Sequence, residues 1–449
     1  MDKMEIYNKL PVFAQNMACY YEGKKIKKNR YGKDFWDLLK NYESRNNWTY
    51  DQLCEYRDDR LRQMVEHCYE TVPYYKRLFD DLGISYKDIN TIEDLKLLPV
   101  LTKQIVNENF NAFISTTIPF KKMVTSHTSG TTGSGFKFYT TNETLCEQWA
   151  VWWRYRRNLG INFDDWCALF GSKLIVPVTQ KKPPYWRINE PCKQVYFSAF
   201  HENPEYLYYY YKEIKRRKLK WLHGFPSLIT LFASFMVENN LELGYDMKFV
   251  TTGAENLLGY QRNIIEKAFG TKVFQHYGLA EGVSNFSQDV SGTMCVDEDF
   301  AVTEFVPNDG NFDIIGTSLS NLAMPLIRFE TGDKATFVYD EKNQKRIIYT
   351  LGGRIEDYIT LRNGVKIGKL DHAFKDTINI KEAQIYQKSN YDIIIYVVKC
   401  KADISKDENV ASKLLRMSWG NDINFEFKHV EEIPRLKGGK LKFVISDVL

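Results

Sequence analysis

The chain has 449 residues, 44% of them hydrophobic and 26% charged, with a formal net charge of +4. At about 100–200 residues per domain, this length predicts a folded protein of two or three structural units. The balanced charge argues against a dedicated nucleic-acid binder, which would carry a basic stripe. No apolar run approaches the roughly 18 residues that a membrane-spanning helix needs, so no integral membrane segment is expected.

The cysteines and the N-terminus indicate the compartment. Eight cysteines are scattered singly, with no CxxC pair and no disulfide framework, which suits a reducing compartment. The first residues, MDKMEIYNKL, place acidic and polar side chains where a signal peptide needs an apolar core. We therefore expect a cytoplasmic protein, monomeric or homodimeric, without a nucleic-acid partner. Association with a membrane surface stays open.

Residues 1–100 predict helices. In the segment 51–83, apolar side chains recur near a 3.6-residue period, Pro73 interrupts the pattern and Gly83 ends it. Between about 120 and 350, short β-branched or aromatic runs alternate with amphipathic stretches, which predicts an α/β sheet. The expected strands are 167–171, 174–178, 248–253 and 272–278, and the expected helices are 206–221, 226–240 and 260–270.

The strands shorten from 302 to 350 and become turn-linked, which predicts a small antiparallel or β-barrel-like subdomain. A Gly-rich, charged junction follows, and we place a domain boundary at Arg354. The expected fold class is thus α/β, with a large N-terminal domain of mixed α/β sheets and a small α+β C-terminal domain. The expected domains are 1–353 and 354–449; within the second, strands are expected at 391–400, 425–430 and 440–445 and a helix at 412–419.

The first candidate site is a Ser/Thr/Gly loop, TSGTTGSG, from Thr128 to Gly135. Its glycines let the backbone curl so that successive N–H groups point at an anion, and its hydroxyls add donors for phosphate oxygens. It differs from the GxxxxGK[ST] loop of P-loop NTPases, because no Lys-Ser/Thr pair follows the last glycine. We interpret it as a phosphate cradle. A flexible linker is the alternative, which the β-like run 136–141 disfavours.

TSGTTGSG resembles the phosphate loop of the adenylate-forming enzymes, which include acyl-CoA synthetases, peptide-synthetase adenylation domains and luciferases. One such motif is weak evidence, whereas six in order are strong. The N-terminal stretch from Leu61 to Lys103 and the ending GKLKFVI are similar to the phenylacetate-CoA ligase and CapK branch, so the resemblance covers nearly the whole chain. The other five segments, in order, are TTGAENL (251–257), FQHYGLAEG (274–282), RFETGDKA (328–335), GGRIED (352–357) and IPRLKGGKLKFV (433–444).

The resemblance implies an AMP-forming ligase that activates a carboxylic acid with ATP as an acyl-adenylate, releasing pyrophosphate. It implies ATP and Mg²⁺ as cofactors, with CoA as a possible co-substrate. Two anions must meet in this reaction, so the site must neutralise charge and hold an in-line geometry. At the matching positions, ATP would be bound by Thr128, Ser129, Gly130, Thr131, Thr132, Gly133, Gly253, Ala254, Glu255, Tyr277, Gly278, Asp333 and Arg354.

Individual roles follow from the same motif positions. Glu281 would help coordinate Mg²⁺, a hard cation that prefers carboxylate and phosphate oxygens. Tyr277 would stack on or flank adenine, with core packing as its alternative. Asp333 would accept hydrogen bonds from the two ribose hydroxyls, with a turn role as its alternative. Glu255 would line the adenine edge, or cap the helix that starts near Leu258.

The resemblance also assigns the C-terminal residues. Arg354 would contact ribose or phosphate, beside the hinge residues Glu356 and Asp357. Lys440 would be the catalytic lysine, whose point charge stabilises the charge that develops on the α-phosphate and carboxylate oxygens; its alternative is a surface lysine. The second half-reaction of the superfamily usually involves rotation of a mobile C-terminal domain, which would withdraw Lys440.

The sequence does not identify the carboxylic acid substrate. The segment 223–235 resembles the helix that lines the acyl pocket, and two histidines lie beside motifs, although a lone histidine is more often structural. The candidate substrate-binding residues are Phe225, Pro226, Ser227 and His127, and His276 joins Lys440 and Glu281 as a catalytic candidate.

Related members often hold a zinc ion with a Cys and a His just after the Tyr-Gly-x-x-Glu motif. The matching positions here carry Asp289 and Cys295. One thiol with nearby acids is not a convincing tetrahedral zinc set, so we expect no structural zinc.

Three functions stay open. A CoA ligase acting on an aromatic acid is implied by the similarity to phenylacetate-CoA ligase. An amide- or ester-forming ligase in capsule or O-antigen polysaccharide biosynthesis is implied by the CapK side, with an amine or sugar as acceptor. The tryptophans between 149 and 166 would suit sugar stacking, though helix packing explains them equally. A non-catalytic nucleotide-binding relative is the third, against which the retained motifs argue.

Overall fold

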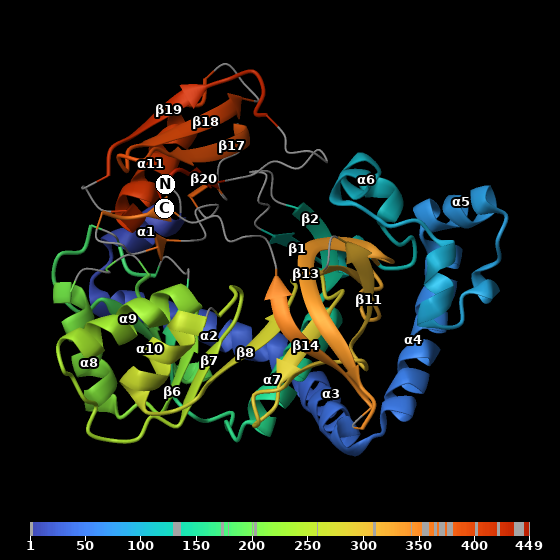
Figure 1. The fold of residues 1–449 in the computed structure, drawn as a ribbon, viewed down its shortest axis with the longest axis horizontal. Coiled ribbons are helices and arrows are strands. Elements are labelled where there is room, and N and C mark those ends of the chain that lie inside the picture. Colours follow the sequence, from blue (N-terminus) through green and yellow to red (C-terminus); the bar gives the residue numbers. More distant parts are fainter. Residues whose placement is uncertain are drawn as a thin grey trace. The chain divides into compact units, whose positions relative to one another are not determined.

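The structure is a computed structural model of the chain (Figure 1). Two compact units can be separated in it: Met1–Ser126 with Phe138–Gly353, and His127–Lys137 with Arg354–Leu449. We propose that the chain has two domains, 1–353 and 354–449. The structure describes residues 3–128, 136–171, 175–177, 179–199, 201, 204–257, 259–308, 311–342, 344–352, 359–362, 366–367, 373–374, 380–399, 403–419, 423–434 and 444–448.

Residues 3–97 of the first unit are mainly helical. A capping box begins the fourth helix, where the Thr49 hydroxyl accepts from the Gln52 backbone N–H and the Gln52 side chain accepts from Thr49. Pro73 occupies the first turn of the next helix, and Gly83, with φ of 66°, ends it. The helices are α1 (Lys3–Lys9), α2 (Val12–Arg30), α3 (Lys33–Ser44), α4 (Tyr50–Thr71), α5 (Pro73–Leu82) and α6 (Lys103–Glu108).

One mixed sheet of twelve strands organises the first unit, in the order β11-β12-β13-β14-β10-β9-β8-β7-β6-β3-β5-β4. Strands β5, β3, β6, β7 and β8 are parallel, and the pairing turns antiparallel between β8 and β9. The strands are β3 (Cys167–Phe170), β4 (Trp186–Asn189), β5 (Gln194–Phe197), β6 (Trp221–Gly224), β7 (Phe249–Thr252), β8 (Val273–Gly278), β9 (Asn285–Gln288), β10 (Met294–Val296), β11 (Ala301–Asn308), β12 (Asn311–Ser318), β13 (Phe329–Asp340) and β14 (Lys345–Gly352).

Successive side chains of a strand point to opposite faces of the sheet. Both faces of the parallel strands are apolar here, and helices cover each of them. Leu222 and Val250 point into a core with α8 (Pro204–Arg217), α9 (Pro226–Glu238) and α10 (Gly259–Phe269). Trp221 and Phe249, one residue earlier on the same strands, pack against α3 and α7 (Asn142–Asn158). The predicted α/β fold class is confirmed.

The antiparallel strands β11–β14 are those expected between 302 and 350, and they curl strongly (Figure 1). Register shifts on β12–β13 and β13–β14 supply bulges that bend strands. One strand prediction is wrong: residues 175–177, within the run 174–178, form no strand. Pro177 has no N–H to donate to a ladder, so the apolar run does not pair.

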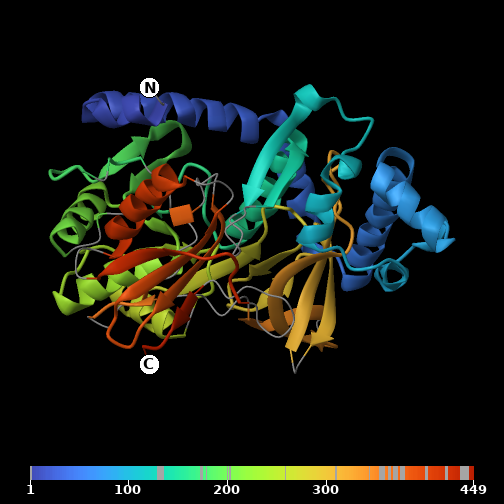
Figure 2. The ribbon, with the colours of Figure 1, turned by 90° about the horizontal axis from the view of Figure 1, so that it is seen from above.

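Helix α2 lies along the edge strand β4 (Figure 2). The Asn16 side chain accepts the backbone N–H of Ile188 at 3.0 Å, and Gln15 accepts from Arg187 at 2.7 Å. A covered edge strand presents fewer free backbone groups to other chains. No helix among the described residues has both the length and the apolar character needed to cross a bilayer.

The second unit contains a four-stranded sheet in the order β19-β18-β17-β20, packed on one helix. The strand pairs β17–β20 and β18–β19 are parallel, while β17–β18 is antiparallel. Two short strands, β15 (Ile359–Thr360) and β16 (Lys366–Ile367), pair separately, as do β1 (Met123–Thr128) and β2 (Phe136–Thr141). The sheet and its helix are β17 (Ile380–Gln387), β18 (Ile393–Lys399), β19 (Phe425–His429), β20 (Val444–Ser446) and α11 (Ser405–Trp419).

Buried ion pairs attach α7 to the segment that follows β10. Arg154 of α7 pairs with Asp297 at 2.8 Å and Asp299 at 2.7 Å, and Arg45 pairs with Asp299 at 2.6 Å. Burial alone would raise the pKa of Asp299, but the two arginines hold it below its ordinary value. The neighbouring Glu298 pairs with Arg57 and Arg346.

Replacement of Arg154 by leucine should strongly destabilise the first unit, because it leaves Asp297 without its arginine and the buried Asp299 with Arg45 alone. We expect a loss of about 3–5 kcal/mol in the free energy of unfolding, measured by urea titration. Arg157→Ala is the matched control on the same helix, since Arg157 makes an exposed pair with Glu43, worth at most about 1 kcal/mol. Equal effects of the two substitutions would contradict this role.

Candidate active site

The candidate site lies where the parallel strands β6, β7 and β8 end. Ligands of open α/β sheets bind outside the carboxyl ends of the strands, where the pairing pattern changes. Here β8 pairs in parallel with β7 and antiparallel with β9. The predicted residues follow these strand ends: Phe225 and Pro226 after β6, Gly253, Ala254 and Glu255 after β7, and His276, Tyr277 and Gly278 at the end of β8.

Tyr277 and Asp333 meet directly. The Tyr277 hydroxyl donates to Asp333 Oδ2 at 2.9 Å, although the two are 56 residues apart. Burial and the Asp333 charge raise the pKa of Tyr277 well above its ordinary value, so its hydroxyl stays protonated and donates. One face of the Tyr277 ring stacks on Phe286, with centroids 4.7 Å apart. The hydrogen bond fixes the orientation of the Asp333 carboxylate.

The turn after β7 is tight. A Cβ atom at Gly253 would lie 2.8 Å from Cε1 of His276, so only glycine fits beside this imidazole. Ala254 follows with φ of 66°, a left-handed conformation that is uncommon outside glycine and concentrates at functional sites. The Asn256 side chain then donates to the carbonyl of Leu351 at the end of β14.

Helix α7 supports the end of β8. The Trp152 indole N–H donates to Asn285 Oδ1 at 2.8 Å, and a Cβ at Gly278 would lie 2.7 Å from that oxygen and 2.9 Å from the indole nitrogen. Trp152 also lies 5.5 Å from the His276 ring. Trp152 therefore packs between α7 and β8, where it contacts the predicted site residues Gly278 and His276.

His276 is held neutral. Burial and then the nearby charge of Arg156 lower its pKa to about 3, and its Nδ1 atom has no hydrogen-bond partner. His223 on β6 stacks 6.3 Å from it and has its pKa lowered by the same causes. A neutral imidazole can donate or accept one hydrogen bond but adds no charge. The catalytic role predicted for His276 stays a prediction.

Glu281 is buried, with 5% of its surface exposed, in the turn that follows β8. Mg²⁺ is usually bound by one or two protein carboxylates and by substrate phosphates, so a single buried carboxylate fits this ion. No cluster of three or more His, Cys, Asp or Glu side chains suited to a metal occurs in the described part of the chain. Asp289 accepts the backbone N–H groups of Ser291 and Thr293 in the β9–β10 turn.

Several predicted residues are placed only in part. His127 is an exposed residue of β1 in the second unit, and Thr128 ends that strand. Ser227 lies in the first turn of α9. The other predictions, Ser129, Gly130, Thr131, Thr132, Gly133, Arg354 and Lys440, lie outside the described residues.

Sequence reasoning missed two residues of α7, Tyr155 and Arg156. Both are buried beside the candidate site, with the Tyr155 ring 5.4 Å from that of His276. Their signal is local: they follow Trp152 by three and four residues, the spacing that places side chains on one helix face. Their neighbours on β6 and β8 are distant in the sequence, so only the fold shows the cluster.

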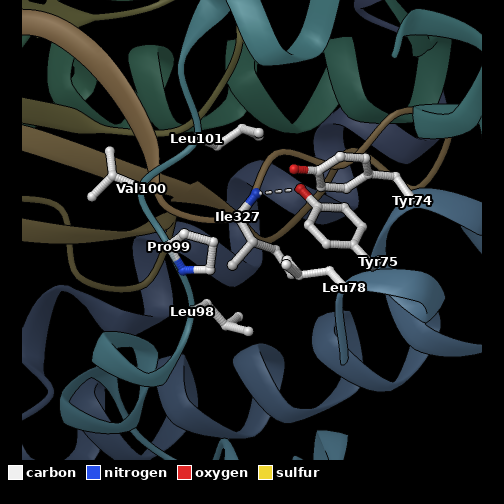
Figure 3. A pocket seen from close by; sticks show the side chains of 8 residues that line it. All are labelled: Tyr74, Tyr75, Leu78, Leu98, Pro99, Val100, Leu101 and Ile327. Carbon is white, nitrogen blue, oxygen red and sulfur yellow. Dashed lines mark hydrogen bonds between the residues drawn. The ribbon is translucent and has the colours of Figure 1, made fainter. Parts of the chain in front are cut away.

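A small recess lies elsewhere in the first unit, between α5, the segment 98–101 and Ile327 (Figure 3). The backbone N–H of Ile327 donates to the Tyr75 hydroxyl at 2.8 Å, which donates in turn to the carbonyl of Pro325. Its space is about 10 Å³, room for no more than one water molecule. The recess is therefore too small to be a candidate for the substrate site.

Comparisons with known proteins show what the chain as a whole is similar to. The family model described as the CapK C-terminal domain matches residues 359–447. Protein CapK of Staphylococcus aureus is 28% identical over 99% of both chains, and the phenylacetate-coenzyme A ligase of Escherichia coli (strain K12) is 26% identical over 71% of this chain and 74% of its own. The resemblance to the adenylate-forming superfamily, in its phenylacetate-CoA ligase and CapK branch, is confirmed.

The fold is shared with solved structures. A 2-hydroxyisobutyryl-CoA ligase in complex with 2-HIB-AMP and CoA, in the thioesterification state, superposes with a TM-score of 0.60 at 19% identity, covering 90% of this chain and 91% of that chain. The same ligase in the postadenylation state gives a TM-score of 0.53 at 18% identity, over 87% and 89%. This similarity establishes the fold, while the names of the relatives indicate an AMP-forming ligase.

Stability should fall on acidification because His276 is neutral when folded. Its pKa is about 3 in the folded chain and 6.5 ordinarily, so between these values the unfolded chain binds the extra proton. From pH 6.5 to pH 5 this one group should cost about 2 kcal/mol of unfolding free energy. Urea unfolding at pH 7 and pH 5 should therefore show a smaller loss for His276→Gln than for the wild type. Exposed His127→Gln is the control, and equal losses in all three proteins would refute the assignment.

Proposed function

We propose that this protein uses ATP to activate a carboxylic acid as an acyl-adenylate, with release of pyrophosphate, and then transfers the acyl group to an acceptor. The contact between Tyr277 and Asp333 carries the proposal. It brings together, in one unit, two motifs that the resemblance assigns to the adenosine part of ATP. The AMP-forming ligases among the relatives support the same reaction class.

Each group then has a task set by its chemistry. The Asp333 carboxylate, oriented by Tyr277, would accept hydrogen bonds from the ribose diol. Glu281 would hold Mg²⁺, which neutralises phosphate charge as the carboxylate attacks the α-phosphate. Lys440 would add a second positive charge beside the α-phosphate and carboxylate oxygens. Withdrawal of Lys440 by movement of the C-terminal domain, 354–449, would then make room for the acceptor.

CoA is the acceptor that we propose first, and an aromatic acid the substrate. Four curated relatives are named phenylacetate-coenzyme A ligase, and the superposed structure is of a CoA ligase with CoA bound. These names support thioester formation as the second half-reaction. The four curated relatives all name phenylacetate, whereas the solved structure is of a 2-hydroxyisobutyryl-CoA ligase, so the acid is proposed from the curated relatives alone.

A CapK-like ligase is the second candidate. CapK of Staphylococcus aureus matches 99% of this chain and of its own length, whereas the phenylacetate-CoA ligase of Escherichia coli matches 71% of this chain. The CapK C-terminal domain model covers residues 359–447, within the domain whose movement is proposed to make room for the acceptor. This favours an amine or sugar acceptor, and an amide or ester product in surface-polysaccharide biosynthesis.

The test is pyrophosphate release across a panel of carboxylic acids, each with CoA, with an amine, with a sugar or with no acceptor. We expect acid-dependent release, with turnover stimulated by CoA. Stimulation by an amine or sugar instead would establish the CapK-like function. If no acid of the panel gives release of pyrophosphate, adenylation is overturned and a nucleotide-binding protein is favoured.

Lys440→Ala should lower pyrophosphate release by orders of magnitude with ATP binding retained, while its neighbour Lys442→Ala should not.

The Tyr277–Asp333 contact makes a separate prediction. Asp333→Asn should raise the KM for ATP about tenfold or more, since charge-assisted hydrogen bonds to a carboxylate are roughly twice as strong as neutral ones. Tyr277→Phe should have a smaller effect of the same sign, because the carboxylate remains but loses its orientation. Asp340→Asn, at the far end of the same strand, is the control. A changed KM for the acid with an unchanged KM for ATP would contradict the ribose role.

A further inference from the structure

Arg156 of α7 is buried without an acidic partner. Only 5% of its surface is exposed, and its Nε atom has no hydrogen-bond partner. Within the described residues it forms no ion pair, and the side chains that act most strongly on its charge are Tyr31, Cys167, Tyr155 and Arg30, none of them a carboxylate. A buried charge without a counter-ion is costly, so such a group calls for an explanation.

The other buried arginines show the contrast. Arg45, Arg57, Arg154 and Arg328 each pair with a carboxylate, at 2.6–2.8 Å. The fifth, Arg187, donates to the Gln15 side chain and to backbone carbonyls. The fold therefore supplies acceptors to buried guanidinium groups elsewhere, and Arg156 is the exception among these described side chains.

Aromatic rings surround Arg156 and offset part of the cost. Its guanidinium lies 5.6 Å from the Trp149 ring, 5.2 Å from Trp153 and 5.4 Å from Trp221. Cation–π contacts favour the charge, yet they satisfy no N–H group. Three indole faces thus hold the guanidinium in position and leave its hydrogen-bonding capacity for an acceptor.

Two further unpartnered polar atoms lie beside Arg156. The Tyr155 hydroxyl is buried and has no partner, and neither has Nδ1 of His276. The two rings are 5.4 Å apart, and the charge of Arg156 lowers the pKa of His276. Arg156 and Tyr155 therefore offer unused N–H and O–H donors, whereas neutral His276 donates its one N–H to the Thr252 backbone carbonyl and keeps Nδ1 as an acceptor.

This cluster lies directly behind the candidate site. His276 precedes Tyr277, which bonds Asp333, and its ring packs on Gly253. Trp152 contacts the end of β8, and Tyr155 and Arg156 follow it by about one helical turn on α7. Arg156 packs on Trp221, the first residue of β6, so a substrate bound at the carboxyl ends of the strands must extend along α7 to reach it.

We propose that the acid substrate carries a second anionic group, most simply a carboxylate, which binds Arg156 together with the Tyr155 hydroxyl. The inference rests on the proposed adenylation reaction and names its substrate class, a dicarboxylic acid or other acid with a distal anion. A carboxylate matches the planar guanidinium fork and accepts from several donors at once. The second anion replaces the counter-ion that the fold omits.

The experiment compares acids of equal length that differ only in the distal group: butyrate with succinate, 4-methylbenzoate with terephthalate, and 4-methylphenylacetate with 4-carboxyphenylacetate. Acid-dependent exchange of pyrophosphate into ATP gives kcat/KM for each. The wild type should prefer the dianionic member of a pair by about 100-fold or more, because a site built to bind a polar group strongly rejects the analogue that lacks it. Arg156→Met should abolish this preference, and Arg156→Lys, which keeps the charge without the fork, should reduce it.

Arg30→Met is the matched control, since Arg30 also lies over the Trp149 ring, at 4.5 Å, but is only half-buried. Thermal unfolding adds a readout without turnover: the preferred dianion should raise the Tm of the wild type and not that of Arg156→Met. Because the substitution removes an unpaired buried charge, Arg156→Met alone should be at least as stable as the wild type.

Two results would overturn the inference while adenylation stands. One is equal or better exchange with the monocarboxylic acids in the wild type, and the other is an unchanged preference in Arg156→Met. A lower Tm of Arg156→Met with no change in selectivity would make Arg156 a structural residue. Absence of exchange with every acid, mono- and dianionic, would instead refute the proposed adenylation, and the inference with it.

Discussion

The ion pairs between Arg154 and the aspartates 297 and 299 are the interaction on which the site depends. They lie in the interior of the first unit and tie α7 to the segment that follows β10, so the helix has one fixed position against the sheet. From that position α7 presents Trp152 to the end of β8 and Arg156 to the strands beneath. A buried pair of this kind adds little net stability compared with apolar packing, but it is costly to break. Its effect here is to specify geometry.

The change of direction between β8 and β9 explains why the chemistry gathers at one place. Parallel strands end on one side of the sheet, and the turns that follow β6, β7 and β8 lie next to one another there. The antiparallel strands extend the same sheet and carry Asp333 to the end of β8, where Tyr277 orients it. A left-handed Ala254 and a glycine pressed against His276 show how closely the backbone is packed at this edge.

Charge within the site is asymmetric. Asp333 and Glu281 suit the nucleotide and its cation, whereas the region behind them combines an unpaired guanidinium with two imidazoles that burial keeps neutral. Arg156 is thus the dominant charge near His276, and it acts where water is excluded. In a low-dielectric interior, a fixed cation of this kind selects strongly among ligands, because an uncharged ligand group leaves it unsatisfied.

The sequence by itself determined the fold class, most of the elements that bear the motifs and the candidate residues at the strand ends. It could do so because β3, β7 and β8 and the helices α9 and α10 are local patterns of periodicity and turns, while the candidate residues follow from the resemblance of the motifs to a known family. It failed at 174–178, where an apolar run containing Pro177 forms no strand in its described part, since a run does not reveal whether it finds a pairing partner. Only the tertiary structure decided that Tyr277 bonds Asp333 and that Arg156 is buried among Trp149, Trp153 and Trp221, with no carboxylate of the described residues paired to it. The physical reason is that counter-ions and burial are properties of neighbours distant in sequence, which exist only once the chain has folded.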